Sequence, residues 1–247
     1  FPGVQPTPNW IYSGPGNTAD NRPYGVSADG KFIAGTYKAG SGYYLYRWTE
    51  ANEFEQSLGM LSSPPDNENN VVCEISKDGS IIAGGATSDG IYRWTKESGT
   101  VLIGKLPGNT NRQTFFKGMS GDGSTIVGYD AVGSNRAFVW TLQSGLQQVG
   151  AYLTTQSVDT ANWTFKESQA ISPDGGTIAG RGVGPNGEKT WVYSVRNSHT
   201  YSLADGNGST HNHLFTIDAN GTLKTSAIFD YEANATRSIR VRVTDDQ

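Results

Sequence analysis

The stretch Cys73-Glu-Ile-Ser-Lys-Asp-Gly-Ser-Ile-Ile-Ala-Gly84 decides the fold, because its pattern occurs four times in the chain. Each copy reads Ser-x-Asp-Gly and then runs through small apolar residues to a glycine. The other copies are Tyr24–Gly35, Lys117–Gly128 and Gln169–Gly180, and successive serines lie 44 to 52 residues apart. Ser-x-Asp-Gly favours a tight turn, since glycine accepts a positive φ and aspartate bonds back to the backbone. Each copy therefore predicts two strands joined by a turn.

Two further strands are expected after each copy. The third is aromatic and ends in Trp48, Trp94, Trp140 or Trp191, and the fourth is more polar, over residues 54–59, 100–104 and 146–150. Four strands in about every 45 to 50 residues, with no helical periodicity between them, are typical of β-propeller blades. We predict an all-β fold with a small β-propeller of four blades, five blades being the alternative. We expect the four tryptophans to lie in the core between blades.

The last copy lacks a comparable fourth strand, whereas Asn9-Trp-Ile-Tyr-Ser13 reads as a strand without a blade. We expect residues 9–13 to complete the last blade and close the ring over residues 1–196. Closure would remove the exposed sheet edges that invite aggregation.

The four copies resemble the extracellular repeat of the HAF family, whose unit combines Ser-x-Asp-Gly, an aromatic strand and a Leu-Gly element. The resemblance covers about residues 14–193. It implies a β-propeller in a secreted or cell-surface protein, and it implies no particular ligand.

Residues 197–247 form a different segment, in which Leu214–Thr225, Phe229-Asp-Tyr-Glu232 and Ser238–Asp245 replace the repeat pattern. These stretches resemble the later half of a bacterial cadherin-like domain over about residues 198–247. Ile239, Val241 and Val243 alternate with polar residues, which predicts a half-buried strand. Half of a sandwich leaves apolar faces uncovered. We therefore expect this segment to pack on the propeller, to pair with another chain, or to belong to a longer protein.

The cadherin-like resemblance implies that Asp230 and Glu232 help to bind calcium. Calcium favours about 6 to 8 oxygen ligands, so two carboxylates make a partial site, and turn or surface contacts are the alternative role. His211 and His213 could offer two metal ligands on one side of a strand, but a third is not identifiable. We predict no other cofactor.

Composition excludes several function classes. The net charge is −4 and no basic block occurs, so we expect no nucleic-acid partner. No apolar run reaches the roughly 18 residues of a membrane span. The single cysteine, Cys73, excludes an internal disulfide and reads as a core residue.

Catalysis is not assigned by the sequence. The three histidines lie beyond the repeats, and no Gly-x-Ser-x-Gly elbow is present. Four equivalent serines indicate a structural hydroxyl that bonds to the backbone of each turn.

A ligand is expected where the connections from a fourth strand to the next first strand gather, at residues 14–23, 60–71, 105–115 and 151–167. These connections differ from one another and are rich in hydrogen-bonding groups, and amides beside an exposed aromatic ring suit sugars. Turn geometry is the alternative role for their Asn and Asp residues. The candidate ligand-binding residues are Asn21, Arg22, Asp66, Glu68, Asn109, Asn111, Arg112 and Trp163.

These observations predict a secreted or cell-surface binding or adhesion module, with an extracellular glycan or a surface protein as its partner. A polysaccharide hydrolase or lyase acting at the same face is one alternative. A structural segment of a larger surface protein is the other.

Overall fold

The computed structural model describes residues 22–49, 53–55, 58–62, 71–86, 89–110, 113–131, 133–195, 199–218, 221–230 and 236–245. The chain forms two compact units, Phe1–Ser194 and Val195–Gln247. Among the described residues the fold is all-β, with one short α-helix, which confirms the predicted class.

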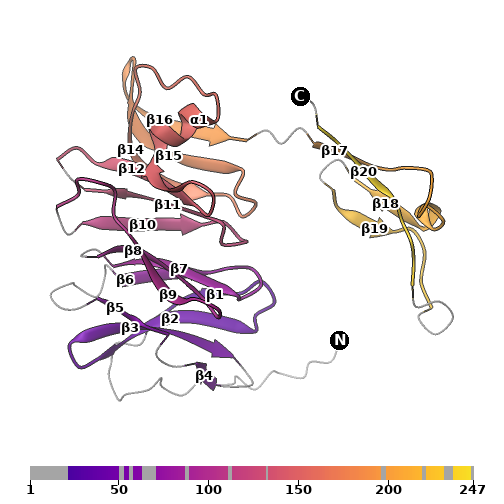
Figure 1. Cartoon of the computed structure of the whole chain (residues 1–247), viewed down its shortest axis with the longest axis horizontal. Coiled ribbons are helices and arrows are strands. Elements are labelled where there is room, and N and C mark those ends of the chain that lie inside the picture. The colour runs from indigo at the N-terminus through magenta and orange to yellow at the C-terminus, as the bar shows by residue number, and fades with distance from the viewer. Residues whose placement is uncertain are drawn as a thin grey trace, which may run out of the picture. The chain divides into compact units, whose positions relative to one another are not determined.

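The first unit contains four antiparallel sheets, one for each copy of the repeat (Figure 1). Sheet 1 consists of β1 (Arg22–Val26), β2 (Phe32–Ala39), β3 (Gly42–Thr49) and β4 (Glu53–Glu55), with β5 (Met60–Ser62) also paired to β3. Sheet 2 consists of β6 (Val71–Ile75), β7 (Ile81–Ala86), β8 (Gly90–Thr95) and β9 (Gly99–Gly104). Sheet 3 consists of β10 (Thr114–Met119), β11 (Thr125–Asp130), β12 (Arg136–Thr141) and β13 (Gly145–Gln148). Helix α1 (Val149–Thr155) leads to sheet 4, which consists of β14 (Thr164–Ile171), β15 (Thr177–Gly184) and β16 (Gly187–Ser194).

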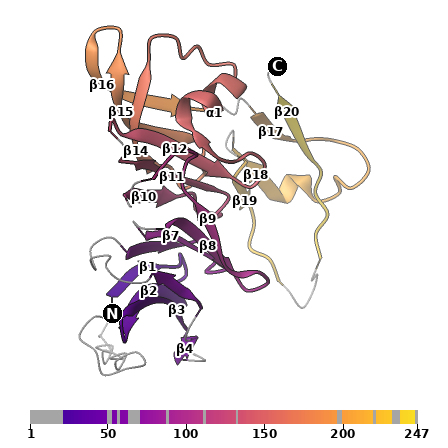
Figure 2. The same ribbon diagram turned by 60° about the vertical axis from the view of Figure 1, so that its left-hand side comes forward.

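The four sheets pack face to face in chain order, as consecutive propeller blades do. Strand β2 contacts β6, β7 contacts β10, and β11 contacts β14. Sheets 1 and 4 lie at opposite ends of the row in both views (Figures 1 and 2). The predicted closing strand, residues 9–13, lies outside the described residues, so ring closure and the number of blades stay predictions.

The Ser-x-Asp-Gly turns explain the repeat in local terms. The Ser27 hydroxyl donates to Asp29 Oδ1 (2.8 Å) and accepts from the Phe32 amide (3.0 Å), while the same Asp29 oxygen accepts from the Lys31 amide (3.1 Å). Gly30 has a φ of 75°, which favours glycine. The same bonds recur at Ser76, Ser120 and Ser172, so these serines hold the turns, as expected.

Neighbouring sheets are joined at these turns. The Ala28 amide donates to the Lys77 carbonyl (2.8 Å), the Lys77 amide to Gly121 (2.7 Å), and the Gly121 amide to Pro173 (2.8 Å). Arg47 of sheet 1 reaches across to sheet 2 and donates to the Gly79 carbonyl (2.8 Å). Its guanidinium lies over the Phe32 and Trp94 rings, at 4.9 and 4.8 Å.

The glycine that ends each copy lies beneath an aromatic ring of the third strand. A Cβ on Gly84 would lie 2.0 Å from the Val72 carbonyl oxygen and 2.5 Å from the Tyr92 hydroxyl. The residues paired with these glycines are Tyr46, Tyr92, Phe138 and Trp191.

The expected equivalence of the four tryptophans is therefore wrong at the last copy. Trp191 pairs with Gly180, whereas Tyr193 pairs with Ile178 and takes the position that Trp140 has beside Ile126. An aromatic residue near the end of a strand does not by itself show which residue lies opposite the glycine; the hairpin register decides it.

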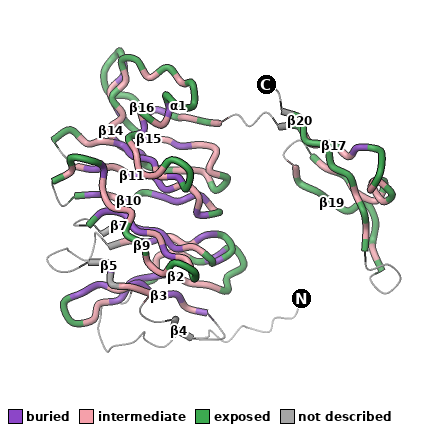
Figure 3. Tube along the Cα trace, viewed as in Figure 1, coloured by how far each residue is buried: buried purple, intermediate pink, exposed green. Residues whose placement is uncertain are grey.

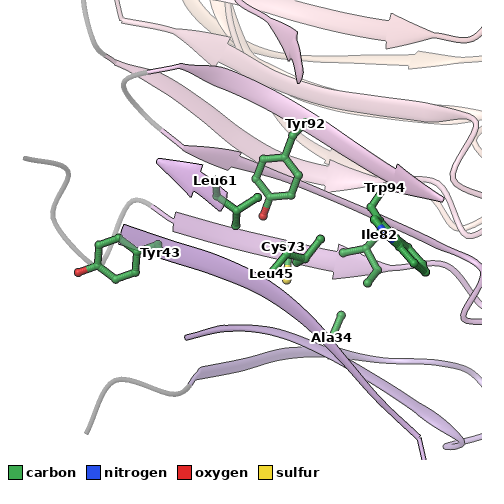
Figure 4. Close-up of a cluster of buried hydrophobic side chains, with 8 residues drawn as sticks. All are labelled: Ala34, Tyr43, Leu45, Leu61, Cys73, Ile82, Tyr92 and Trp94. Carbon is green, nitrogen blue, oxygen red and sulfur yellow. The ribbon is translucent and has the colours of Figure 1, made fainter. Parts of the chain in front are cut away.

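The core lies between the sheets. Between sheets 1 and 2, Leu45 packs against Cys73, Ile82 and Tyr92 (Figure 4). Cys73 is 3% exposed, and burial raises the pKa of its thiol, as expected for a core cysteine. Of the four tryptophans, two are buried and two are half-buried; the buried ones are Trp94 and Trp191, the half-buried ones Trp48 and Trp140.

The second unit consists of two strand pairs. Strand β17 (His199–Leu203) pairs with β20 (Val241–Asp245), and β18 (Phe215–Ile217) pairs with β19 (Leu223–Thr225), with a 3-10 turn, η2 (Asn212–Leu214), before β18. Most of its described residues are exposed or half-exposed (Figure 3). Val243 is 55% exposed, so the alternation in β20 does not bury this side chain.

Candidate functional site

A cluster of polar and aromatic side chains lies between sheets 3 and 4. We call it the polar–aromatic cluster. Its members come from β10, β11, the β11–β12 hairpin, β14 and β15, and they are Phe115, Lys117, Tyr129, Asn135, Glu167, Gln169 and Arg181. Tyr129 lies near the end of β11 and Asn135 in the hairpin that follows. The cluster is therefore toward the strand ends opposite the Ser-x-Asp-Gly turns, the face on which a ligand is predicted.

Glu167 is the centre of the cluster and is only 3% exposed. Its Oε1 accepts hydrogen bonds from Asn135 Nδ2 and from Arg181 Nη2, both at 2.6 Å, and its Oε2 accepts from Gln169 Nε2. The Arg181 bond lowers the pKa of Glu167 against the opposing effect of burial, and the two amides act in the same direction as Arg181. Glu167 is therefore a carboxylate at neutral pH.

An aromatic pair lies beside this carboxylate. The Phe115 and Tyr129 rings stack with centroids 4.9 Å apart and planes at 24°. The Lys117 ammonium lies 5.6 Å from the Tyr129 ring centroid. Burial raises the pKa of the Tyr129 phenol, and the charge of Glu167 adds to that effect. The phenol therefore stays protonated and can donate a hydrogen bond.

This arrangement suits binding better than acid–base chemistry. A general acid needs a pKa near the working pH, and the pKa of Glu167 is lowered. The Arg181 side chain is 58% exposed and carries five N–H donors, of which only a part is needed to hold Glu167. The half-buried ring pair, the guanidinium and the amides together offer an apolar face beside hydrogen-bonding groups.

A second buried carboxylate has a structural role. Asp130 accepts bonds from the Thr114 hydroxyl (2.7 Å) and the Leu106 amide (3.2 Å), and Arg136 lies 3.6 Å away. Asn109 donates to the same Thr114 hydroxyl (3.3 Å). These bonds hold the connection between β9 and β10 on sheet 3.

The carboxylates of the repeat turns line a hollow of about 400 Å³ on the opposite face, beside Lys77 and Pro173. Asp78, Asp122 and Asp174 each accept bonds from the serine hydroxyl and a backbone amide of their own turn. These bonds lower the pKa values of the three carboxylates, whose role is to hold their own turns.

The predicted ligand residues do not come together in the described part of the chain. Asn109 braces its connection, and Arg22 is a half-buried residue at the start of β1. Trp163 stacks with Phe165, at 5.9 Å, and packs against Gly184. The remaining candidates lie outside the described residues: Asn21, Asp66, Glu68, Asn111 and Arg112.

Sequence reasoning missed Tyr129 and Arg181 because they lie in strands, outside the connections that it searched. Glu167 is the last residue of the expected connection 151–167, but it lies in β14 and was not among the candidates. The usable signal was a pair of opposite charges, Glu167 and Arg181, that flank the fourth copy of the repeat and lie in the paired strands β14 and β15. Charged residues in a strand flanked by other sheets need partners.

The calcium prediction is untested. Asp230 is exposed in the second unit, and Glu232 lies outside the described residues. Within the described ranges, no group of three or more His, Cys, Asp or Glu residues could hold a metal ion. His211 Nδ1 already accepts a hydrogen bond from the Ser238 amide (2.9 Å).

Comparisons with known proteins leave the family open. No family model matches the chain, and no curated protein matches it significantly. Similar solved structures include TolB from Acinetobacter baumannii, with 14% identity and a TM-score of 0.40 over 71% of this chain and 40% of that one. A TolB structure from Agrobacterium tumefaciens has 17% identity and a TM-score of 0.39, over 92% of this chain and 76% of that one. A prolyl endopeptidase structure has 9% identity and a TM-score of 0.40, over 92% and 36%.

At TM-scores this low we draw no conclusion about function, and the HAF-type and cadherin-like resemblances stay predictions. The chain spans less than two thirds of the Acinetobacter protein and of the endopeptidase. Within the residues that the structure describes, no helix has the length and apolar character needed to cross a membrane.

Proposed function

We propose that this chain is a secreted or cell-surface binding module that binds carbohydrate at the polar–aromatic cluster. The observation that carries the proposal is the ionised, nearly buried Glu167, held by three side-chain donors beside the stacked pair Phe115–Tyr129. Aromatic rings pack against the apolar face of a sugar, and amide, guanidinium and carboxylate groups bond its hydroxyls.

The cluster is ordered before a ligand arrives. Glu167 fixes Asn135, Gln169 and Arg181 through direct hydrogen bonds, so these side chains lose little further freedom on binding. In the proposed complex, a sugar ring lies on the Tyr129–Phe115 pair and its hydroxyls meet Arg181. Lys117, over Tyr129, favours an acidic sugar because it brings a second cation to the same surface.

A glycan array screened with the full chain, followed by calorimetry on the best oligosaccharide, tests the proposal. We expect Tyr129→Ala and Arg181→Ala each to weaken binding, with a rise in the dissociation constant of about tenfold or more. Tyr44→Ala is the matched control, since Tyr44 stacks on Tyr37 in sheet 1 at 5.4 Å, away from the cluster. An array without a specific ligand, or equal losses in all three variants, would contradict carbohydrate binding here.

A further inference from the structure

Among the residues that the structure describes, sheet 4 has three strands, whereas the other three sheets each have a fourth. In sheet 3, Phe138–Thr141 of β12 pair with Gly145–Gln148 of β13, and β9 and β4 pair in the same way in sheets 2 and 1. The corresponding part of sheet 4 is Trp191–Ser194 of β16. Within the described residues this edge of β16 has no strand beside it.

A groove lies along this open edge. It has a volume of about 290 Å³, and its lining comes from α1, the loop after α1, β14 and β16: Leu153, Val158, Asp159, Trp163, Phe165, Thr190, Trp191, Val192 and Tyr193. Four of these residues are aromatic and three are aliphatic. An open strand edge between apolar side chains fits an extended peptide, which adds main-chain hydrogen bonds and fills side-chain pockets.

A buried donor in the groove also lacks a partner. Trp191 lines the groove and is 5% exposed, and no described group accepts a hydrogen bond from its indole N–H. Buried polar groups in proteins are nearly always bonded. An incoming backbone carbonyl or polar side chain is the kind of group that would satisfy it.

The row of sheets ends at sheet 4. The first three turns each donate a backbone amide to the next turn, but the residue in that position of the fourth turn is Pro173, which has no N–H. Val139 of sheet 3 is fully buried, while Val192, at the same register position of sheet 4, is 65% exposed. Sheet 4 therefore offers an edge to a single strand, and it lacks the turn contact that a fifth sheet would use.

We propose that residues 9–13 of a second copy of the chain occupy this groove as the fourth strand of sheet 4. Asn9-Trp-Ile-Tyr-Ser13 is a short run of aromatic and β-branched residues, which favours a strand, and Pro15-Gly-Asn-Thr18 follows it. Pro107-Gly-Asn-Thr110 likewise follows the established fourth strand β9, and aligning the two turns makes Asn9 equivalent to Val101. The segment thus has the sequence context of a fourth strand.

The distance across the row favours a second copy over the same chain. Nine peptide steps separate Ser13 from Arg22, the first residue of β1, and fully extended they span about 31 Å. Stacked sheets lie about 10 Å apart, so sheet 4 is about 30 Å from sheet 1 along the row, and the fourth-strand position lies about 14 Å to the side of the first strand. Pro15-Gly16 favours a turn and shortens the connection further. A same-chain strand would therefore need a connection stretched to about its full length, whereas a strand from a second copy meets no such limit.

Cysteine cross-linking in the full chain tests this proposal, because the native Cys73 is buried and protonated. In sheet 2, Arg93 pairs with Val101, and the equivalent residues are Val192 of sheet 4 and Asn9 of the added strand. After mild oxidation of Asn9→Cys/Val192→Cys, we expect disulfide-linked dimers and higher species on a non-reducing gel. Mixing the two single variants should give one cross-linked dimer. Asn9→Cys/Val101→Cys is the matched control, since Val101 lies in the established fourth strand β9 and is 47% exposed.

The outcomes separate the possibilities. A disulfide within one chain would overturn the proposal in favour of ring closure by the same copy. The proposal is also overturned if the double variant stays uncross-linked or cross-links no more than the control. Circular dichroism of each variant confirms folding, and sedimentation of the unmodified chain should show a concentration-dependent dimer that is lost when residues 1–13 are removed.

Discussion

Gly84→Ala tests why every copy of the repeat ends in glycine. The new Cβ would lie 2.0 Å from the Val72 carbonyl oxygen and 2.5 Å from the Tyr92 hydroxyl. Real Cβ contacts essentially never fall below 3.0 Å, so β6 must move by about 1 Å and the Tyr92 ring by about 0.5 Å or more. The displaced atoms are a neighbouring strand and a fully buried ring, and neither can swing into solvent.

The expected loss follows from two contributions. Overpacking of a dense core costs about 1–3 kcal/mol, and each weakened ladder hydrogen bond between β6 and β7 adds about 0.5–1.5 kcal/mol. We expect Gly84→Ala to lower the free energy of unfolding by about 3–4 kcal/mol, measured by urea denaturation of the full chain. The midpoint should fall without a large change in slope.

A matched substitution in the same unit should have the opposite sign. Gly150 lies in α1, and its added Cβ would meet only the Phe165 ring, at 3.5 Å, an ordinary contact. Gly150→Ala should therefore stabilise the protein by about 0.5–1 kcal/mol. If Gly84→Ala lies within about 1 kcal/mol of the parent, the reasoning about the glycine and its aromatic partner is wrong.

Two further predictions concern charged groups between sheets. Arg47→Met removes the hydrogen bond to the Gly79 carbonyl and the contacts with the Phe32 and Trp94 rings. We expect the free energy of unfolding, measured in urea, to fall by about 2–4 kcal/mol. A fall no larger than that caused by replacing an exposed arginine would contradict this role. The pKa of Glu167 is lowered in the folded state, so its contribution to stability is present above the ordinary value of 4.5 and is lost as the pH falls through the lowered value. Glu167→Gln should be less stable than the parent at pH 7, and the two should converge as the pH falls through the lowered pKa of Glu167. Thermal unfolding from pH 7 into the acid range measures this, and parallel curves would count against the charge as the cause.

The repeat turns and the class of fold could be read from the sequence because their causes are local. The Ser27 hydroxyl reaches Asp29 and the Phe32 amide, so all three partners lie within a few residues of one another. The glycine of the same turn needs only its own positive φ. Four copies of such a turn, each followed by an apolar run and an aromatic strand, predict four antiparallel sheets, and the described residues of the first unit form four.

The polar–aromatic cluster could not be read in this way. Asn135 and Glu167 are 32 residues apart and belong to different sheets, and Arg181 comes from the next strand. Their meeting depends on how sheet 3 packs against sheet 4 and on the bulges in β14. Loop residues looked more promising because function often lies in loops, yet Asn109 and Trp163 proved to hold the structure together.

The aromatic residue over each glycine separates what the sequence determines from what the packing of the whole chain decides. A buried strand glycine has no side chain, so an aromatic neighbour fills the space over it. This need can be recognised from the sequence alone. Whether Trp191 or Tyr193 meets Gly180 depended on the hairpin register, and a shift of one residue turns every side chain to the other face. Short-range bonding was therefore determined by the sequence itself, whereas pairing register and contacts between sheets were decided only when the whole chain packed.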